Sequence, residues 1–588
     1  MNLKKVLLLC ALTALALALF VGCGSNNEDP VPDEPAATET PATPEATEAP
    51  TETEPALVPD ELVTLRVFSM LANTSGMQDN TYWGEIIRND LNVQIDLLPA
   101  GDEADARLAV LMASRDLPDI VVFRDNPALV TDAIEAGFLV NLDDHHPLIP
   151  DILANAHMGL QFMRDNISMG TGRAYAVPNR ITNQVNRLGS VSGPYLRWDL
   201  YTELGMPHMA AIEDYLEVIQ QMLELEPYNL YGQRNLGFSI FSDWDGNVSW
   251  PVRIVTEMFG VTQDGFGFSE VNFANNNSIT SIYDDNSYFR RAIRFFNQAH
   301  QMGIMDVDII TDTFSDYIEK ANAGRILFQL LSWTSWAYET EETRNSMRSY
   351  KGVFFDEARH IFPTPPYVGD NSWNAVSATS NHIDRALQLL NYMYNFDALW
   401  HLAWGEQGIA WDLTPAGRPY RTARGWEMFN NHLPFDNGGF ISEGLNVMNF
   451  FGMPWHVTHP RFNARMDELD WATTEHTPPD FAVDVSWREA TGAFDSVEYA
   501  YNRGIFVTRP FIPPLPPMPD DLQRILDQVS AENYSFTYRM ILANSDAEFD
   551  ALWDELVHRA YGMGAAEVND WVRDQFAISL AEGARYMY

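Results

Sequence analysis

The chain has 588 residues, of which 46% are hydrophobic and 12% aromatic, so it is long enough to form two or three folded domains. Its 81 acidic and 37 basic residues give a formal charge of −44, and a surface this negative repels nucleic acid and anionic lipid headgroups. Both cysteines, Cys10 and Cys23, lie near the start of the sequence. Thiol catalysis, thiolate metal sites and internal disulfide bonds are therefore excluded for the rest of the chain.

The first residues have the pattern of a lipoprotein signal. Lys4 and Lys5 precede an apolar run from Val6 to Phe20, which is short for a membrane span of about 20 residues and typical of a signal peptide. The following Gly22-Cys23 resembles the lipobox of bacterial lipoproteins, in which the cysteine thiol is diacylated and the cysteine becomes the first residue after cleavage. We expect residues 1–22 to be a signal peptide and Cys23 the lipid attachment point. Cleavage of an ordinary signal peptide nearby is the alternative.

Residues 23–61 have the composition of a tether. The stretch is rich in Pro, Thr, Ala and Glu, and from Gly24 to Glu61 it contains eleven acidic residues but no basic or aromatic one. Such a sequence cannot bury apolar surface, and its like charges and prolines keep it extended. We expect it to connect the lipid anchor to the folded part of the protein.

The first folded segment alternates strand and helix patterns. Strands are expected at 62–70, 93–97 and 120–123, where β-branched residues and alternation occur, and helices at 78–91, 102–114 and 128–136, where apolar residues recur on one face. This order predicts a mainly parallel sheet with helices on both faces. Ligands of such sheets bind beyond the carboxyl ends of the strands, where Asn73 and Asn126 lie. No glycine-rich phosphate loop occurs at these ends, so no cofactor is expected.

Several ordered blocks resemble the family 1 extracellular solute-binding lipoproteins of ABC importers, especially the long carbohydrate-binding members. The blocks are PDIVVF, AIEAGFLVNLDDH, GRAYAVPNR, YLRWDLYTELGMP, NAGRILFQLLSWTSW, WNAVSATSNHIDRALQLLNYMYN and WGEQGIAWDLTPAGRPY. The resemblance implies an α/β fold of the periplasmic-binding-protein type II, with two lobes that close on a sugar and additional C-terminal helices. It further implies an extracellular protein on the cell membrane, partnered by the permease subunits of a transporter.

The resemblance also suggests lobe boundaries. We expect a first lobe formed by residues 62–179 and 373–424, and a second lobe formed by residues 180–367. Residues 425–588 are expected to complete the lobes and to be largely helical towards the end. A monomer is expected.

One departure from the family concerns calcium. Long members often carry an Asp- and Asn-rich calcium loop after the first helix of the second lobe, whereas residues 226–235 here lack alternating carboxylates. The fragment Asp243-Trp244-Asp245-Gly246 lacks the bidentate Glu that such a loop needs. We therefore expect no metal at either place, and solvated turn aspartates at the second.

Sugar rings pack on flat aromatic side chains, while their hydroxyl groups hydrogen-bond to planar polar groups. Tryptophans near strand ends and lobe crossings, together with polar residues beside them, are therefore the candidate ligand-binding residues. Trp333 and Trp336 lead, because their segment resembles the family's cleft-facing tryptophans. The full set is Asn73, Asn126, Arg180, Trp198, Asp199, Trp250, Trp333, Trp336, Trp373 and Trp411.

These features predict a lipid-anchored protein that binds an oligosaccharide and delivers it to an ABC permease, without enzymatic activity and without catalytic residues. One alternative is a surface glycoside hydrolase, which needs only two suitably spaced carboxylates, and 81 acidic residues cannot exclude such a pair. The other alternative is a binder of a non-carbohydrate solute such as a peptide.

Overall fold

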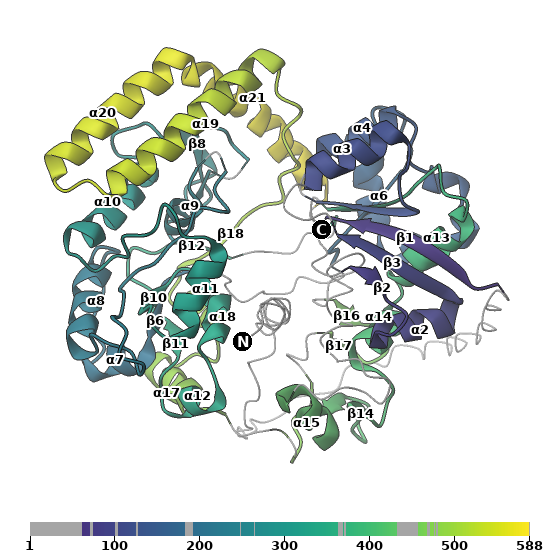
Figure 1. Ribbon diagram of the computed structural model, residues 1–588, viewed down its shortest axis with the longest axis horizontal. Coiled ribbons are helices and arrows are strands. Elements are labelled where there is room, and N and C mark those ends of the chain that lie inside the picture. The colour runs from purple at the N-terminus through teal and green to yellow at the C-terminus, as the bar shows by residue number, and fades with distance from the viewer. Residues whose placement is uncertain are drawn as a thin grey trace, which may run out of the picture.

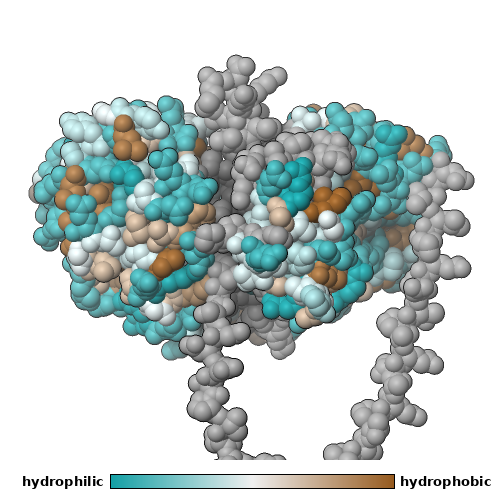
Figure 2. Space-filling model, turned by 90° about the horizontal axis from the view of Figure 1, so that it is seen from below, coloured by the Kyte–Doolittle hydropathy of each residue, from teal (hydrophilic) through white to brown (hydrophobic). Residues whose placement is uncertain are grey.

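The computed structural model describes residues 61–70, 75–99, 104–124, 127–182, 192–246, 248–263, 265–362, 368–369, 372–431, 457–466, 471–475, 477 and 480–586. The chain forms two lobes that lie side by side, and three long C-terminal helices pack along the second lobe (Figure 1). Seen from below, the lobes are two rounded bodies whose visible faces are mostly hydrophilic (Figure 2). No helix in these ranges is both long and apolar enough to cross a membrane.

The first lobe is built on a six-stranded sheet in the order β2–β3–β1–β4–β13–β5. Strands β1 (Val63–Ser69), β3 (Val93–Pro99) and β4 (Ile120–Phe123) are parallel, as the sequence predicts. The sheet is nevertheless mixed, because β2 (Gly76–Met77), β13 (Trp373–Val376) and β5 (Val177–Pro178) pair antiparallel to their neighbours. Since β13 pairs with β4, the chain has returned to the first lobe by Trp373.

Helices cover this sheet. The helix α2 (Tyr82–Leu91) begins where Thr81 accepts a hydrogen bond from the Gly84 N–H, and it ends where Asn92 adopts a left-handed conformation. The other helices of the first lobe are α3 (Ala104–Ser114), α4 (Pro127–Glu135), α5 (Pro150–Asn155), α6 (His157–Phe162), α13 (Ile383–Tyr392), α14 (Phe396–Trp404) and α15 (Ala423–Asn431). Two small hairpins, β14 (Trp411–Leu413) with β15 (Pro419–Arg421) and β16 (Thr458–His459) with β17 (Ala464–Arg465), lie beyond them.

The second lobe has a small sheet in the order β10–β6–β11 and a second one in the order β7–β8–β9. The strands are β6 (Tyr195–Arg197), β7 (Val261–Thr262), β8 (Ser269–Asn272), β9 (Ser278–Ser281), β10 (Phe328–Gln329) and β11 (Tyr350–Gly352). The helices are α7 (Trp198–Glu203), α8 (Asp214–Leu225), α9 (Trp250–Glu257), α10 (Tyr288–Gln301), α11 (Phe314–Asn322), α12 (Glu341–Asn345), α17 (Ala482–Thr491) and α18 (Ser496–Asn502). A short parallel pair, β12 (His360–Phe362) with β18 (Phe506–Thr508), completes this lobe.

Each lobe has its own hydrophobic core. The chain passes from the first core to the second after Ile181, returns before Val368, leaves again after Trp471 and comes back at Tyr586. The C-terminal helices α19 (Asp520–Ile541), α20 (Asp546–Met563) and α21 (Ala565–Gly583) belong to the second core. The cores are therefore separate, and the chain crosses between them more than once, which is the connectivity that two hinged lobes require.

Candidate ligand-binding site

Four of the expected site residues fall outside what the structure describes. Cys23, Asn73 and Asn126 lie outside the described residues. Trp336 lies in a short 3-10 helix, Ser332–Ala337, but its side chain is outside the described part as well.

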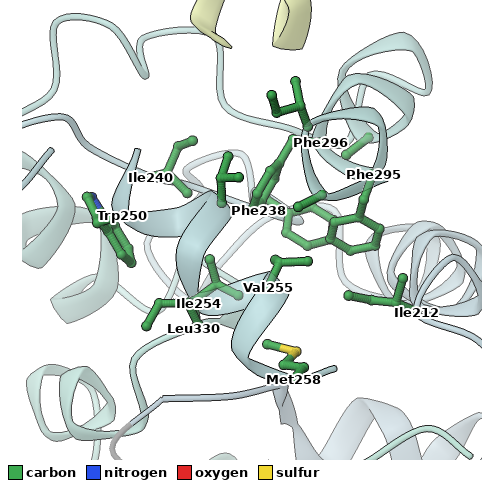
Figure 3. Close-up of a cluster of buried hydrophobic side chains, with 14 of the residues drawn as sticks. Ile212, Phe238, Ile240, Trp250, Ile254, Val255, Met258, Phe295, Phe296 and Leu330 are labelled. Carbon is green, nitrogen blue, oxygen red and sulfur yellow. The ribbon is translucent and has the colours of Figure 1, made fainter. Parts of the chain in front are cut away.

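Two expected tryptophans of the second lobe are packing residues. Trp198 is only 2% exposed, and its indole N–H donates to the Ser486 hydroxyl at 3.0 Å. Trp250 lies inside the core among the side chains drawn in Figure 3, and its indole N–H donates to the Phe241 carbonyl at 2.6 Å. Because neither ring has a free face, their expected role in stacking a sugar is wrong.

The same correction applies to two tryptophans of the first lobe. Trp373, at 1% exposure, lies in the central sheet, with its ring stacked on Phe162 at 6.1 Å between centroids. Trp411 is buried against Trp400, and its indole N–H donates to the Gly405 carbonyl at 2.9 Å. Both residues follow polar or turn segments in the sequence, but Trp373 begins a strand that is buried throughout and Trp411 is the buried first residue of β14.

The expected polar residues have different surroundings. Asp199 is held by the buried Arg197, whose guanidinium donates to both carboxylate oxygens at 2.8 and 2.7 Å. Its carboxylate therefore serves an internal ion pair. Arg180 is exposed just after β5, and its φ of 51° lies in the left-handed region that non-glycine residues rarely adopt.

Three aromatic side chains of the second lobe stack on one another, which we call the aromatic platform (Trp244, Phe314 and Trp333); Trp244 is exposed, whereas Phe314 and Trp333 are half-buried. The rings of Trp244 and Trp333 are nearly parallel, with centroids 5.8 Å apart and planes 18° apart. The ring of Phe314 stacks on Trp244 at 4.7 Å and 29°. Trp244 is 45% exposed, whereas most large aromatic side chains of this lobe are buried. An exposed, rigidly stacked ring of this kind is a surface on which a flat apolar face can bind.

Local structure fixes each member of the platform. Trp333 lies in the 3-10 helix that follows β10, where Thr334 donates from its buried hydroxyl to the Leu331 carbonyl at 2.7 Å. Phe314 is the first residue of α11, and the capping box of Thr313 and Asp316 fixes the start of that helix. Figure 1 shows α11 on the flank of the second lobe that faces the first lobe.

Sequence reasoning identified this platform only in part. Trp333 is among the expected residues, whereas Trp244 and Phe314 are not. The sequence does not indicate that Phe314 belongs to the platform, because Asp243, which accepts its backbone N–H, is 71 positions away. The exposure of Trp244 follows from its place in a turn, whereas Trp250 begins a buried helix.

The aspartates beside Trp244 do not fit a cation site. Asp243 accepts a hydrogen bond from the Phe314 N–H at 2.7 Å, and Asp245 accepts from the Trp250 N–H and the Tyr538 hydroxyl, both at 2.8 Å. Asp243 is exposed, as expected of a solvated turn aspartate, whereas Asp245 is half-buried and occupied by protein donors, so the expectation of a solvated side chain is wrong for Asp245. Among the described residues, no three acidic, histidine or cysteine side chains gather as metal ligands would.

An ion pair and side-chain hydrogen bonds hold the loop at residues 226–235. Glu226 forms a two-bond pair with Arg348, with both N–O distances 2.8 Å. The Asn229 side-chain oxygen accepts the N–H groups of Tyr231 and Gln233 at 3.0 and 2.8 Å, which closes the loop. A carboxylate already paired with a guanidinium is a poor ligand for a hard cation.

Carboxyl groups with a raised pKa are candidates for a general acid, and Glu270 and Asp245 are two described examples. Burial raises the pKa of Glu270 to about 7 and that of Asp245 to about 6. Glu270 is 2% exposed and caps α10 by accepting the Phe289 and Tyr288 N–H groups at 2.6 and 3.1 Å. A glycosidic oxygen cannot reach a carboxyl group buried in this way.

Two open hollows on the surface, of about 410 and 440 Å³, lie away from the platform. One is lined by α20 residues including Trp553 and Tyr561, and the other lies between α8 and α10. Neither contains a residue of the expected site.

No protein-family model matches the chain, and no curated protein matches it in sequence. Among solved structures, an HMO-binding, ABC-transporter-associated solute-binding protein from Bifidobacterium longum infantis is 14% identical, with a TM-score of 0.56 over 89% of this chain and 100% of that chain. The alginate-binding protein AlgQ2 without calcium ion is 16% identical, with a TM-score of 0.56 over 88% and 99%. The S. pneumoniae ABC-transporter substrate-binding protein FusA in complex with kestose is 14% identical, with a TM-score of 0.56 over 88% and 100%.

These likenesses extend over nearly the whole length of each solved chain, so they concern both lobes and the C-terminal helices together. The protein therefore has the two-lobed α/β fold of the solute-binding proteins of ABC transporters.

Proposed function

We propose that the protein is a lipid-anchored extracellular receptor that binds an oligosaccharide between its lobes and delivers it to an ABC permease. The observation that carries this proposal is the aromatic platform, in which the exposed Trp244 stacks on Phe314 at the start of α11, the helix on the flank that faces the first lobe (Figure 1). The axial C–H groups of a pyranose ring pack on such a flat surface, and the proposal needs no bond to be broken. Similar folds that carry oligosaccharide ligands support it.

The first lobe would supply the hydrogen bonds to the sugar hydroxyl groups. Arg180 is exposed after β5 and offers a planar fork of donors. Asn73 and Asn126 remain proposed partners, because the strands that precede them end at the same edge of the sheet. Trp336 remains a proposed partner beside Trp333.

A thermal-shift screen against oligosaccharides tests the ligand class. A sugar that binds the native protein raises its melting temperature by mass action, and the rise grows with ligand concentration. Peptides of similar size are the matched set, and a shift with peptides alone would contradict the carbohydrate proposal. New reducing ends at catalytic protein concentration would instead favour a glycoside hydrolase.

The anchor is tested separately. Replacing Cys23 with Ala should move the protein from the membrane fraction to the soluble fraction, because no second acylation site would remain. Replacement of Cys10, which lies inside the apolar run, is the control and should leave fractionation unchanged. Membrane retention of the Cys23→Ala protein would refute the anchor.

A further inference from the structure

The turn that presents Trp244 is fastened on both sides by aspartates. On one side, Asp243 accepts the N–H of Phe314, the first residue of α11, at 2.7 Å. On the other side, Asp245 accepts the N–H of Trp250, the first residue of α9, at 2.8 Å. The backbone N–H of Asp245 also donates to the Ser242 carbonyl at 3.0 Å, which closes the turn. The hydrogen bonds of Asp243 and Asp245 therefore fix the backbone of the turn, although the ring of Trp244 itself is exposed.

Asp245 also connects the turn to the C-terminal helices. Its second carboxylate oxygen accepts the hydroxyl of Tyr538 on α19, at 2.8 Å. Tyr538 is buried, so its position is fixed by the packing of α19. The helix is in turn joined to α10, because Asn297 donates to the carbonyls of Ile541 and Ala543 at 3.2 and 2.7 Å. The C-terminal helix α19 thus supports the turn that carries Trp244.

We propose that Asp245 is the positioning residue of the platform, which keeps the Trp244 ring stacked by tying its turn to α9 and to Tyr538 of α19. Its importance for a bound sugar rests on the proposed function, but its effect on the Trp244 ring does not. The proposal assigns a role to the C-terminal helices in shaping the binding surface of the second lobe.

The protonation of Asp245 gives this contact a pH dependence. Burial raises the pKa of Asp245 to about 6, although the hydrogen bonds from Trp250, Tyr538 and Ser249 act in the opposite direction. The titratable group in contact with it is Tyr538 on α19, on which Tyr534 packs, and Asp243 lies two positions away in the same turn with its carboxylate on the Phe314 N–H. Among the described residues, no cation pairs with its carboxylate. Proton uptake near pH 6 should therefore change the hydrogen bonds that hold the turn.

Fluorine NMR of the ligand-free protein labelled with 5-fluorotryptophan tests the proposal. The chain has 16 tryptophans, and the resonance of Trp244 is identified by its loss in the Trp244→Phe protein. In the parent, this resonance should shift between about pH 4.5 and about pH 8 with a midpoint near the Asp245 pKa. Asp245→Asn keeps an acceptor for the Trp250 N–H and offers an amide N–H that the Tyr538 hydroxyl can accept, so the resonance should stay near the parent position and should not titrate.

Substitutions that remove the hydrogen bonds of Asp245 provide a second test. Asp245→Ala should move the Trp244 resonance towards that of a solvated indole, while circular dichroism remains unchanged. Tyr538→Phe removes one donor to the carboxylate, so it should raise the midpoint of the titration. Tyr534→Phe, one turn away on the same helix and without a hydrogen bond to Asp245, is the matched control and should resemble the parent.

Two results would overturn the proposal. One is a Trp244 resonance in Asp245→Ala that coincides with that of the parent, and the other is a titration near pH 6 that persists in Asp245→Asn. If Asp245→Ala does not fold, Asp245→Asn and Tyr538→Phe still decide the question. Because no sugar is present, a failure here is distinct from a failure of the proposed ligand class.

Discussion

The ring of Phe511 lies edge-on to the ring of Tyr586, with centroids 6.2 Å apart and planes at 86°. Both rings also contact Phe162 of the first lobe, at 5.6 and 5.2 Å. Phe511 leads into the helices of the second core and Tyr586 follows them, so the three rings, which all pack in the first core, form a joint that ties both ends of this helical segment to the first lobe. Tyr586 is held further by its hydroxyl, which donates to Asp165 at 2.9 Å and accepts from Asn166 at 3.0 Å.

We predict that Phe511→Ala uncouples the thermal unfolding of the two lobes. The loss of the ring should cost on the order of 1–3 kcal/mol, because Phe511 is only partly buried. Calorimetry should show two separated transitions where the parent shows one or two overlapping ones. Tyr501→Ala, an exposed aromatic substitution in the second lobe, is the control. Unchanged transitions in Phe511→Ala would mean that the joint carries no coupling.

Closure of the lobes follows from the same connectivity. The chain crosses between two separate cores, so we predict that a bound oligosaccharide reduces the radius of gyration measured by small-angle scattering. Phe511→Ala should still close, because its joint is one contact beside several chain crossings. Superimposable curves with and without saturating sugar would count against hinge closure.

The ion pairs of Asp484 should make the free energy of unfolding fall as the pH is lowered into the acid range. Burial alone would raise the pKa of this carboxyl group, but the neighbouring Lys351 and Arg344 hold it below its usual range. The lowered pKa means that these pairs stabilise the fold above the unfolded pKa of about 4 and that the stability is lost as pH falls through the folded pKa.

Asp484→Ala would leave two cations in a largely buried place. We therefore predict a loss of about 3–5 kcal/mol near neutral pH, measured by urea unfolding. Asp480→Ala, at the more exposed pair with Arg488, is the control and should cost less than about 1 kcal/mol. Equal losses from the two substitutions would show that burial of the Asp484 cluster has no special effect.

The titration of Glu270 should have the opposite effect, so that the free energy of unfolding falls as the pH rises. Its pKa in the folded protein is raised to about 7 by burial, so the bound proton stabilises the fold fully below the unfolded pKa of about 4.5. This contribution is lost as pH rises through about 7. Glu270→Gln should therefore flatten the fall in unfolding free energy between these pH values. If the slope of the unfolding free energy against pH in Glu270→Gln equals that of the parent, another group causes the pH dependence.

The sequence predicted most of the first lobe because its pattern is local. Residues 93–97 alternate, and the helix at 78–91 shows Trp83, Ile86 and Ile87 on one face, all of which are buried. Trp400 and Trp404 lie one turn apart on an apolar helix, a spacing typical of packing residues, and both are buried. The antiparallel edge of the sheet was not predicted, since β13 enters it from far along the chain.

The candidate site could be predicted only in part, because exposure is decided by distant partners. Trp244 and Trp250 bracket the same aspartate and have the same chemistry, yet one is exposed and the other buried. The difference arises because the indole of Trp250 reaches the Phe241 carbonyl inside the core, whereas the ring of Trp244 lies on Phe314 and Trp333 at the surface. The spacing of apolar residues in the sequence does not distinguish the exposed tryptophan from the buried one.

Calorimetry on Trp244→Ala and Trp333→Ala with an oligosaccharide found in the thermal-shift screen tests the central claim most directly. Loss of either stacking ring should weaken binding by about 1–3 kcal/mol, or about tenfold to a hundredfold, while circular dichroism stays unchanged. Tyr231→Ala, a highly exposed aromatic substitution outside the platform, should bind like the parent. If both tryptophan variants fold and bind the sugar as tightly as the parent, the aromatic platform is not the binding surface.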